Sequence, residues 1–240
     1  MTINPNNFEW QPETIEAVEK ATLRMVAQAL YDFSSEAEQI FKNEEDLVAD
    51  MGEDITREAL DRLGYSQIPV RLFGKIDFKK ARYVFHPDYA IRQALFVDSK
   101  AEKLEGEGTA TLQTSQTSMS IRQKRGGKVV EVPGKLPTFI EREGKAYLTS
   151  TIFVKYHYKQ RPRGANKLIN MVVAALPNGS LQEMYNPNER DTIWRAGRDA
   201  PTRGEEFRVR LHFGDLKGKA NWRVQTIIIS PKMEFIWEGP

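Results

Sequence analysis

The chain contains no cysteine and only three histidines among its 240 residues. The missing cysteines exclude disulfide bonds and cysteine-ligated zinc sites. A phosphate-binding glycine loop is also missing, because the nearest match, Gly106-Glu107-Gly108, lacks a third glycine. No nucleophile elbow around a serine or cysteine accompanies the histidines. The sequence therefore disfavours nucleophilic and nucleotide-dependent chemistry.

The sequence has no apolar run near twenty residues and no signal-peptide pattern at its start, which predicts a cytoplasmic protein without a membrane partner. A formal net charge of +2 argues against binding nucleic acid through overall charge alone, although it allows a local basic cleft. Apolar residues make up 40% of the chain, enough for a substantial core, and no repeat or linker interrupts it. We expect a single domain over residues 1–240, with a helical part at 1–64 and a sheet-forming part at 65–240.

Hydrophobic periodicity separates the two parts. Apolar residues at steps of three and four predict a helix over 12–42, with a break near Ser34 and Ser35, and a second helix over 44–63 that stops at Gly64. Runs rich in β-branched and aromatic residues then predict strands at 76–85, 93–100, 148–158, 168–176, 207–213 and 224–230. The strand at 148–158 alternates after an apolar start, which is typical of a central strand that emerges toward solvent. The pattern predicts an α/β (α+β) fold, in which helices flank a mixed sheet.

Asp98 and Lys100 are the leading candidates for chemistry. They lie two residues apart near the end of an apolar strand, so both side chains should share one face. An antiparallel hairpin would bring Asp77 beside Asp98, and two carboxylates with a backbone carbonyl can hold a divalent metal. Similar triplets at 143–145 and 215–217 are predicted to be turns. The alternative for Asp98 and Lys100 is an exposed salt bridge, which contributes little.

Two polar segments, 102–136 and 185–206, are predicted to be long loops, and loops of that length are usually functional. Amides and guanidinium groups read base edges in the major groove, and arginines also contact phosphates. The alternatives are a solvated, mobile first loop and a second loop whose arginines are neutralised by neighbouring acids. The candidate DNA-binding side chains are Gln113, Thr114, Gln116, Arg122, Lys124 and Arg125 in the first segment and Arg195, Arg198 and Arg203 in the second.

Several short segments, taken in order, give the chain a family resemblance. The sequence resembles the SfiI-type restriction endonucleases of the PD-(D/E)xK nuclease superfamily over nearly its whole length. The matching segments include Gly74-Lys75-Ile76-Asp77-Phe78-Lys79, Val97-Asp98-Ser99-Lys100-Ala101, Thr111-Leu112-Gln113-Thr114-Ser115-Gln116, Thr149-Ser150-Thr151-Ile152-Phe153-Val154, Tyr185-Asn186-Pro187 and Pro201-Thr202-Arg203-Gly204-Glu205.

This resemblance implies a PD-(D/E)xK core and a role for each matching residue. Asp77 and Asp98 would be the metal-binding acids, with the Ser99 carbonyl as a further ligand. Lys100 would orient the attacking water and help to deprotonate it. Glu53 on the second helix would join the site through water. The implied metal is Mg²⁺, a hard cation suited to carboxylate and phosphate oxygens.

The implied activity is that of a type II restriction endonuclease, which hydrolyses double-stranded DNA at palindromic and often interrupted sites. Symmetric sites imply a homodimer or homotetramer, and a cognate DNA methyltransferase would be the functional partner. One segment departs from the family pattern: 101–110 holds acids, glycines and threonine where an arginine is expected, so the target should differ. The alternatives are a repair or structure-selective nuclease of the same fold and a DNA-binding protein that does not cleave.

Overall fold

The computed structural model describes residues 11–44, 48–62, 67–72, 81–86, 91–104, 108–142, 145–160, 165–199 and 207–239. Within these ranges, 48–50, 67–72, 81–86, 91–92, 142, 145, 198–199 and 207 are described by their backbone alone. The longer helices are α1 (Pro12–Asp32), α2 (Ser34–Asn43), α3 (Val48–Asp61) and α5 (Phe213–Lys219), and the short helical turns are η2 (Thr114–Gln116), η3 (Gly179–Leu181), α4 (Gln182–Tyr185) and η5 (Asn221–Arg223). The strands are β1 (Gln67–Leu72), β2 (Ala81–His86), β3 (Ile91–Lys103), β4 (Thr109–Leu112), β5 (Ile121–Arg125), β6 (Lys128–Val132), β7 (Phe139–Arg142), β8 (Lys145–Gln160), β9 (Asn166–Leu176), β10 (Trp194–Asp199), β11 (Phe207–His212) and β12 (Val224–Ile228).

The predicted break in the first helix is confirmed at Phe33, between α1 and α2. The second predicted helix corresponds to α3, while the predicted stop at Gly64 lies outside the described residues. Among the helices that the structure describes, none combines the length and the apolar character needed to cross a membrane.

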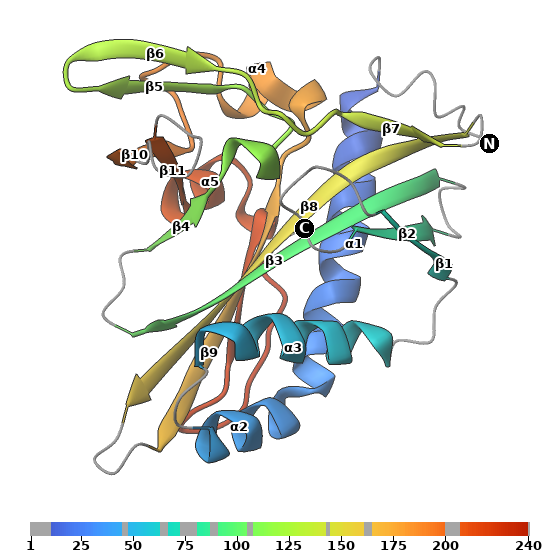
Figure 1. Ribbon diagram of the computed structural model, residues 1–240, viewed down its shortest axis with the longest axis vertical. Helices are drawn as coiled ribbons and strands as arrows, with labels where there is room; N and C mark the ends of the chain where they lie inside the picture. The colour runs from blue at the N-terminus through green and yellow to red at the C-terminus, as the bar shows by residue number, and fades with distance from the viewer. Residues whose placement is uncertain are drawn as a thin grey trace.

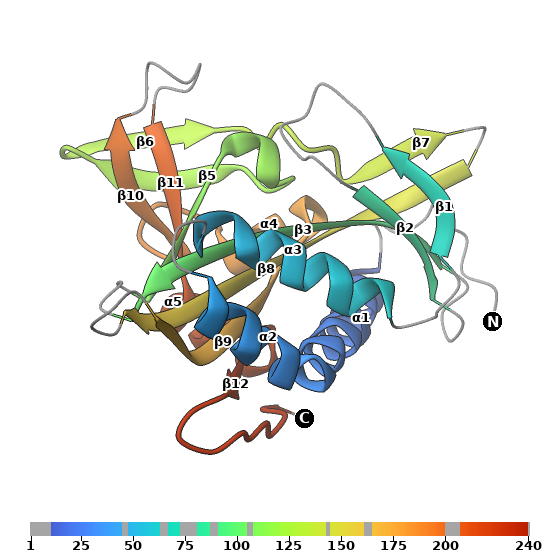
Figure 2. The same cartoon turned by 60° about the horizontal axis from the view of Figure 1, so that its bottom comes forward.

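The central sheet is mixed, as the sequence predicts. Its strands follow the order β1-β2-β3-β8-β9-β12, and β7 pairs with part of β8. The pair β3 and β8 is parallel, and its register sets Asp98 beside Phe153 and Lys100 beside Lys155. The pairs β2–β3 and β8–β9 are antiparallel. Figures 1 and 2 show the long strands β3, β8 and β9 running through the middle of the molecule.

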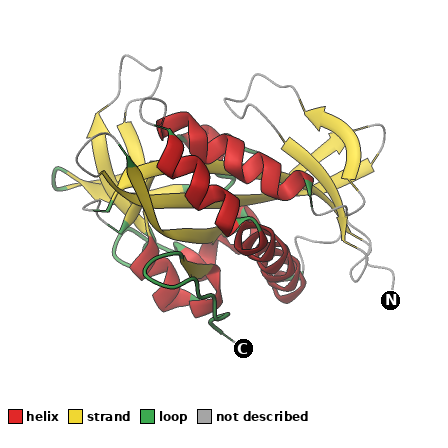
Figure 3. Ribbon diagram, turned by 90° about the horizontal axis from the view of Figure 1, so that it is seen from below, coloured by secondary structure: helices red, strands yellow, loops and turns green. Residues whose placement is uncertain are grey.

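Helices α1, α2 and α3 cover one face of this sheet (Figure 3). Their apolar residues pack on those of β3, β8 and β9, with Phe41, Ile55, Leu95 and Tyr156 in one buried cluster. Phe153 points to the opposite face, where a second cluster joins it to Leu112, Ile121 and Trp194 from the strands beyond the sheet. A core therefore lies on each side of β3 and β8.

The two predicted loops are wrong in part, because each contains strands. Segment 102–136 holds β4, β5 and β6, and segment 185–206 holds β10. Strand β11 pairs with both β10 and β4 in a three-stranded sheet. We name this unit, together with the β5–β6 hairpin, the reading module, and it lies at the opposite end of the molecule from β1, β2 and β7 (Figures 1 and 2). These strands are polar because one side faces solvent.

Two local features explain where the structure differs from the predicted loops and turns. The β5–β6 hairpin turns at Gly126 and Gly127, whose φ angles of 51° and 80° suit a two-residue turn that favours glycine. Residues 215–217, predicted to be a turn, lie inside α5. The ring of His212 begins this helix, because its Nδ1 accepts a hydrogen bond from the backbone N–H of Asp215 at 3.1 Å.

Candidate functional site

Strand β3 presents Asp98 and Lys100 on the face turned away from α1–α3. The Asp98 carboxylate is buried, with 8% of the residue exposed. Lys100 Nζ donates to Asp98 Oδ1 at 3.1 Å, so the predicted salt bridge exists, yet its acid is not at the surface. The other oxygen, Asp98 Oδ2, is buried without a hydrogen-bond partner among the described residues. A buried carboxylate oxygen is costly to leave unpaired, so this atom marks a place for a cation or a donor.

The neighbouring residue, Ser99, points the other way. Its hydroxyl lies 2.7 Å from Thr56 Oγ1 on α3, which in turn lies 2.7 Å from the hydroxyl of Tyr156. Burial raises the pKa of Tyr156, so this hydroxyl keeps its proton. We name Ser99, Thr56 and Tyr156 the hydroxyl chain. The Ser99 hydroxyl is therefore engaged in this chain, and the metal ligand that the sequence predicts at Ser99 is its main-chain carbonyl.

Of the remaining predicted catalytic residues, the structure describes Glu53 and does not describe Asp77. Glu53 lies exposed on α3, directly after Gly52, which packs against the ring of Tyr156 and the backbone of Ala101. Asp77 lies in the segment 73–80, outside the described residues. The hairpin predicted to carry Asp77 is confirmed over its described part, where Ala81 of β2 pairs with Phe96 of β3.

The donor set fits a hard cation. In the part of the chain that the structure describes, no three carboxylate or imidazole side chains converge on one point. Asp98 Oδ2 nevertheless offers an unpaired carboxylate oxygen, and the chain has no cysteine that would favour a softer metal. Carboxylate and carbonyl oxygens are the ligands that Mg²⁺ accepts.

A buried lysine extends this face, and the sequence analysis missed it. Lys155 was expected to emerge toward solvent with β8, but it is 1% exposed. Its Nζ pairs with Glu102 Oε2 at 2.7 Å and donates to the carbonyl of Thr109 at 2.8 Å. His157, two residues on, contacts Asn170 Oδ1 through Nδ1 at 2.8 Å. The only sign of this burial in the sequence is that Lys155 directly follows four mostly apolar residues, 151–154.

The reading module gathers several of the predicted DNA-binding cations. Lys124 is exposed on β5, and Arg125 donates to the carbonyl of Gly197 on β10 at 2.7 Å. The side chain of Arg195 is 54% exposed and pairs with Asp215 at 2.6 Å. The side chain of Arg198, on β10, and the whole of Arg203 lie outside the described residues.

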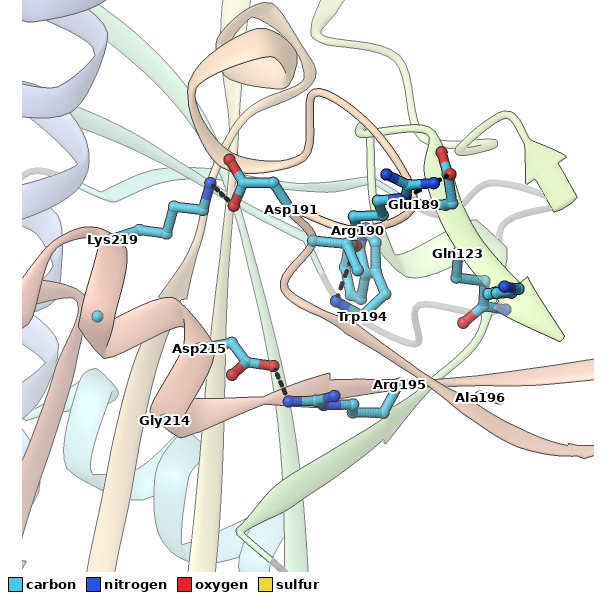
Figure 4. Close-up of a pocket in the computed structure, with 13 residues that line it drawn as sticks. Gln123, Glu189, Arg190, Asp191, Trp194, Arg195, Ala196, Gly214, Asp215 and Lys219 are labelled. Carbon is cyan, nitrogen blue, oxygen red and sulfur yellow. Dashed lines mark hydrogen bonds and ion pairs between the residues drawn. The ribbon is translucent and has the colours of Figure 1, made fainter. Parts of the chain in front are cut away.

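A polar cavity of about 600 Å³ lies between β5, β10 and α5. Figure 4 shows Arg195 reaching across it toward Asp215, and Lys219 toward Asp191. The acid that neutralises Arg195 is therefore Asp215 on α5, while Asp191 from the predicted loop pairs with Lys219 at 2.5 Å. Lys124 and Arg190 also line the cavity.

The other candidates of the first polar segment hold the chain in place. Gln113 and Gln116 cap the turn η2 reciprocally, and Thr114 and Gln116 are buried. Arg122 pairs with Glu183 at 2.8 Å and Glu131 at 3.0 Å, and these hydrogen bonds raise its pKa. Arg122 thereby ties the β5–β6 hairpin to α4. The structure places Lys124 and Arg195 at one cavity, with Arg125 next along β5, whereas the four residues described here are engaged in contacts within the chain or buried.

Comparisons with known proteins all point to one class of proteins. A family model described as type II restriction enzyme SfiI matches residues 14–227. The chain is similar to the type II restriction enzyme SfiI of Streptomyces fimbriatus, with 32% identity over 93% of this chain and 87% of that protein. The crystal structure of tetrameric SfiI bound to cognate DNA superposes with a TM-score of 0.84 and 31% identity, over 95% of this chain and 91% of that one. The restriction endonuclease BglI, bound to its DNA recognition sequence, shares the fold, with a TM-score of 0.75 and 18% identity over 95% of each chain.

Proposed function

This chain belongs to the SfiI family of type II restriction enzymes and is a site-specific endonuclease, and from that premise we propose that it hydrolyses double-stranded DNA with Mg²⁺ at the Asp98 face of β3. The site cut would be palindromic, either continuous or interrupted. The observation that carries the proposal is the buried Asp98 carboxylate, which has one oxygen paired with Lys100 and the other unpaired. A surface salt bridge would leave both oxygens in water.

In this proposal, Asp98, Asp77 and the Ser99 carbonyl hold Mg²⁺. When bound, Mg²⁺ supplies the positive charge that stabilises a reacting phosphodiester. Lys100 is 37% exposed, so its ammonium can donate to an attacking water while Asp98 holds it in place. Hydrogen bonding from an ammonium lowers the cost of removing a proton from that water. Glu53 would act at the edge of the site through a water, from its place on α3 next to the contact with Ala101.

The reading module would contact the DNA. Its exposed cations suit phosphate contacts, and its amides and guanidinium groups suit base edges. Lys124, Arg125 and Arg195 already lie together at one end of the molecule. The proposed direct contacts to DNA are Lys124, Arg125, Arg195, Arg198 and Arg203. Gln113, Thr114, Gln116 and Arg122, which the sequence also proposes, would act through the segments that they hold in place.

Assembly and cellular context follow from the same proposal. A palindromic site has two-fold symmetry, so a homodimer or a homotetramer would place one active site on each strand. The relative SfiI is tetrameric in complex with cognate DNA. An enzyme that cuts duplex DNA in the cytoplasm endangers the host chromosome, so we propose a DNA methyltransferase of the same specificity as its functional partner.

The test is cleavage of a long DNA of known sequence, with Mg²⁺ or with EDTA, followed by sequencing of the fragment ends. We expect discrete fragments that share an end motif, and only with Mg²⁺. A smear would contradict sequence specificity and indicate a repair or structure-selective nuclease. Intact DNA across several unrelated genomes would contradict cleavage and indicate a protein that only binds.

A further inference from the structure

We propose that the ion pair between Glu102 and Lys155 is a positioning link, which fixes the catalytic strand β3 against the reading module and makes the cleavage rate depend on a correctly bound target. This inference rests on the proposed function of the Asp98 face. Lys155 and Glu102 would act through the position of Asp98 and Lys100, and neither would touch the reacting phosphate.

The first step is the place of Glu102 on β3. Glu102 follows Lys100 by two residues, so Asp98, Lys100 and Glu102 share one face of the strand. The parallel register sets Lys155 beside Lys100 and His157 beside Glu102. Lys155 reaches Glu102 Oε2 at 2.7 Å. The pair therefore lies on the same face as the candidate catalytic residues, one step further along the strand.

The second step is the other contact of the same ammonium. Lys155 Nζ donates to the carbonyl of Thr109 at 2.8 Å, at the start of β4. Glu102 and Thr109 stand at the two ends of the connection from β3 to β4. One buried ammonium thus holds both ends of the segment that joins the catalytic strand to the reading module. This is also the segment whose sequence departs from the family pattern.

The third step continues from Thr109 to the cavity of Figure 4. Thr109 pairs with His212 across β4 and β11. His212 Nδ1 accepts from the backbone N–H of Asp215 at 3.1 Å, and the Asp215 carboxylate pairs with Arg195 at 2.6 Å. Contiguous contacts therefore connect the Asp98 face with an arginine of the proposed DNA-binding set.

The charges around the link favour a fixed pair. Lys155 is 1% exposed, so its ammonium lacks water to replace Glu102 if the pair breaks. His157 is the neighbouring titratable group, and burial lowers its pKa, as does the adjacent Lys155 charge. An uncharged imidazole adds no second positive charge beside Lys155, so it does not compete with Lys155 for the Glu102 carboxylate. The Glu102 side chain is 39% exposed, so the charge of a DNA strand bound nearby would act on this carboxylate.

The test compares Lys155→Met, which keeps an unbranched side chain of similar bulk and removes the ammonium, with Lys159→Met as a matched control. Lys159 is an exposed lysine on the same strand. Single-turnover cleavage at saturating DNA is measured on the target and on a target with one altered base pair, and Kd and thermal stability are measured in parallel. We expect Lys155→Met to lower the rate on the target about 10- to 100-fold, the scale of a small misplacement of catalytic groups. The rate on the altered site should fall less, while Kd for the target stays near the wild-type value.

A second variant covers the case in which Lys155→Met does not fold. Glu102→Gln keeps the shape of the link and removes its negative charge, and it should shift both rates in the same direction by a smaller factor. Combining Lys155→Met with Arg195→Ala should give less than the product of the single effects, as expected for residues that act through one network. The proposed link would be overturned if both variants kept the wild-type rates and the wild-type discrimination between the two sites. It would also be overturned if the rates fell only in proportion to the loss of folded protein.

Asp98→Ala is measured alongside to separate the two proposals. If it is inactive while both link variants behave as wild type, the link is wrong and the catalytic assignment stands. If Asp98→Ala cleaves at the wild-type rate, the catalytic assignment is wrong, and the link falls with it.

Discussion

The two faces of β3 differ in how their polar groups are satisfied. On the face toward α3, the hydroxyl chain pairs every hydroxyl with another, with Ser99, Thr56 and Tyr156 at 2.7 Å spacings. On the opposite face, Asp98 keeps one buried oxygen without a described partner. Adjacent residues of one strand thus face a closed network and an open one. The paired hydroxyls stabilise the fold, whereas the unpaired carboxylate oxygen is available to bind a cation.

The largest effect on cleavage should come from changing Asp98 or Lys100, on the face of β3 that carries the unpaired oxygen. Replacing Asp98 with alanine removes a proposed metal ligand, and we expect cleavage to fall at least about a thousandfold, on the scale of losing a principal catalytic group. Lys100→Ala should behave likewise. Specific DNA binding should persist in both, as measured by gel shift with labelled target. Asp54→Ala is the control, because Asp54 is an exposed acid on α3 that pairs only locally with Arg57 among the described residues.

The closed face should respond in stability and not in chemistry. Thr56→Val leaves the hydroxyls of Ser99 and Tyr156 without their shared partner, so we expect the free energy of unfolding to fall by about 1–3 kcal/mol. The cleavage rate per folded molecule should stay near that of the wild type. Urea titration followed by tryptophan fluorescence measures the first quantity, and Thr56→Ser should restore it. A Thr56→Val enzyme with full stability and lost cleavage would reverse the roles of the two faces.

A smaller effect, on DNA binding, is expected when single arginines are replaced, because each variant loses one contact to phosphate. Arg195→Ala should reduce the slope of log K against log salt by about 0.9, because each phosphate contact releases about one counterion. Arg198→Ala and Arg203→Ala carry the same expectation. Arg62→Ala, on the helical side of the molecule, is the control and should leave the slope unchanged. An unchanged slope in all three arginine variants would favour base contacts or structural roles.

The smallest effect concerns the pH dependence of stability near Lys155. Burial lowers the pKa of His157 below its ordinary value of 6.5. A folded pKa below the unfolded one gives a contribution that is present above pH 6.5 and lost as the pH falls through the folded value. Wild-type protein should therefore lose more stability than His157→Gln between pH 7 and pH 5 in urea titrations. Parallel losses in both proteins would show that His157 takes up its proton without penalty.

The sequence predicts the helices and the core strands of the central sheet much better than the strands of the reading module. The helices and the buried strands β3, β8, β9, β11 and β12 stand out, because a core imposes a regular spacing on apolar residues. Strands β4, β5, β6 and β10 do not, because one side of each faces solvent. In addition, β4 pairs with β11, which lies far along the chain. Glycine pairs such as Gly126-Gly127 are the only local sign of such hairpins.

The candidate site divides in the same way. Alternation along β3 was enough to place Asp98 and Lys100 on one face. The burial of Lys155 could not be predicted, because its partners Glu102 and Thr109 lie on other strands and their meeting depends on the whole fold. The acid that neutralises Arg195 was also missed, since Asp215 lies on a helix read as a turn. The single domain over 1–240 stays a prediction, as do the catalytic roles of Asp77, Asp98, Lys100 and Glu53.

The central claim is that the unpaired oxygen of Asp98 is a metal ligand. Its most direct test is Mn²⁺ binding followed by electron paramagnetic resonance, since Mn²⁺ takes the same oxygen ligands as Mg²⁺. The wild type is compared with Asp98→Asn, which keeps the shape of the side chain, and with Asp54→Asn as the control acid. We predict that Asp98→Asn loses a binding site that Asp54→Asn retains. Equal numbers of sites and equal affinities in all three proteins would contradict the account.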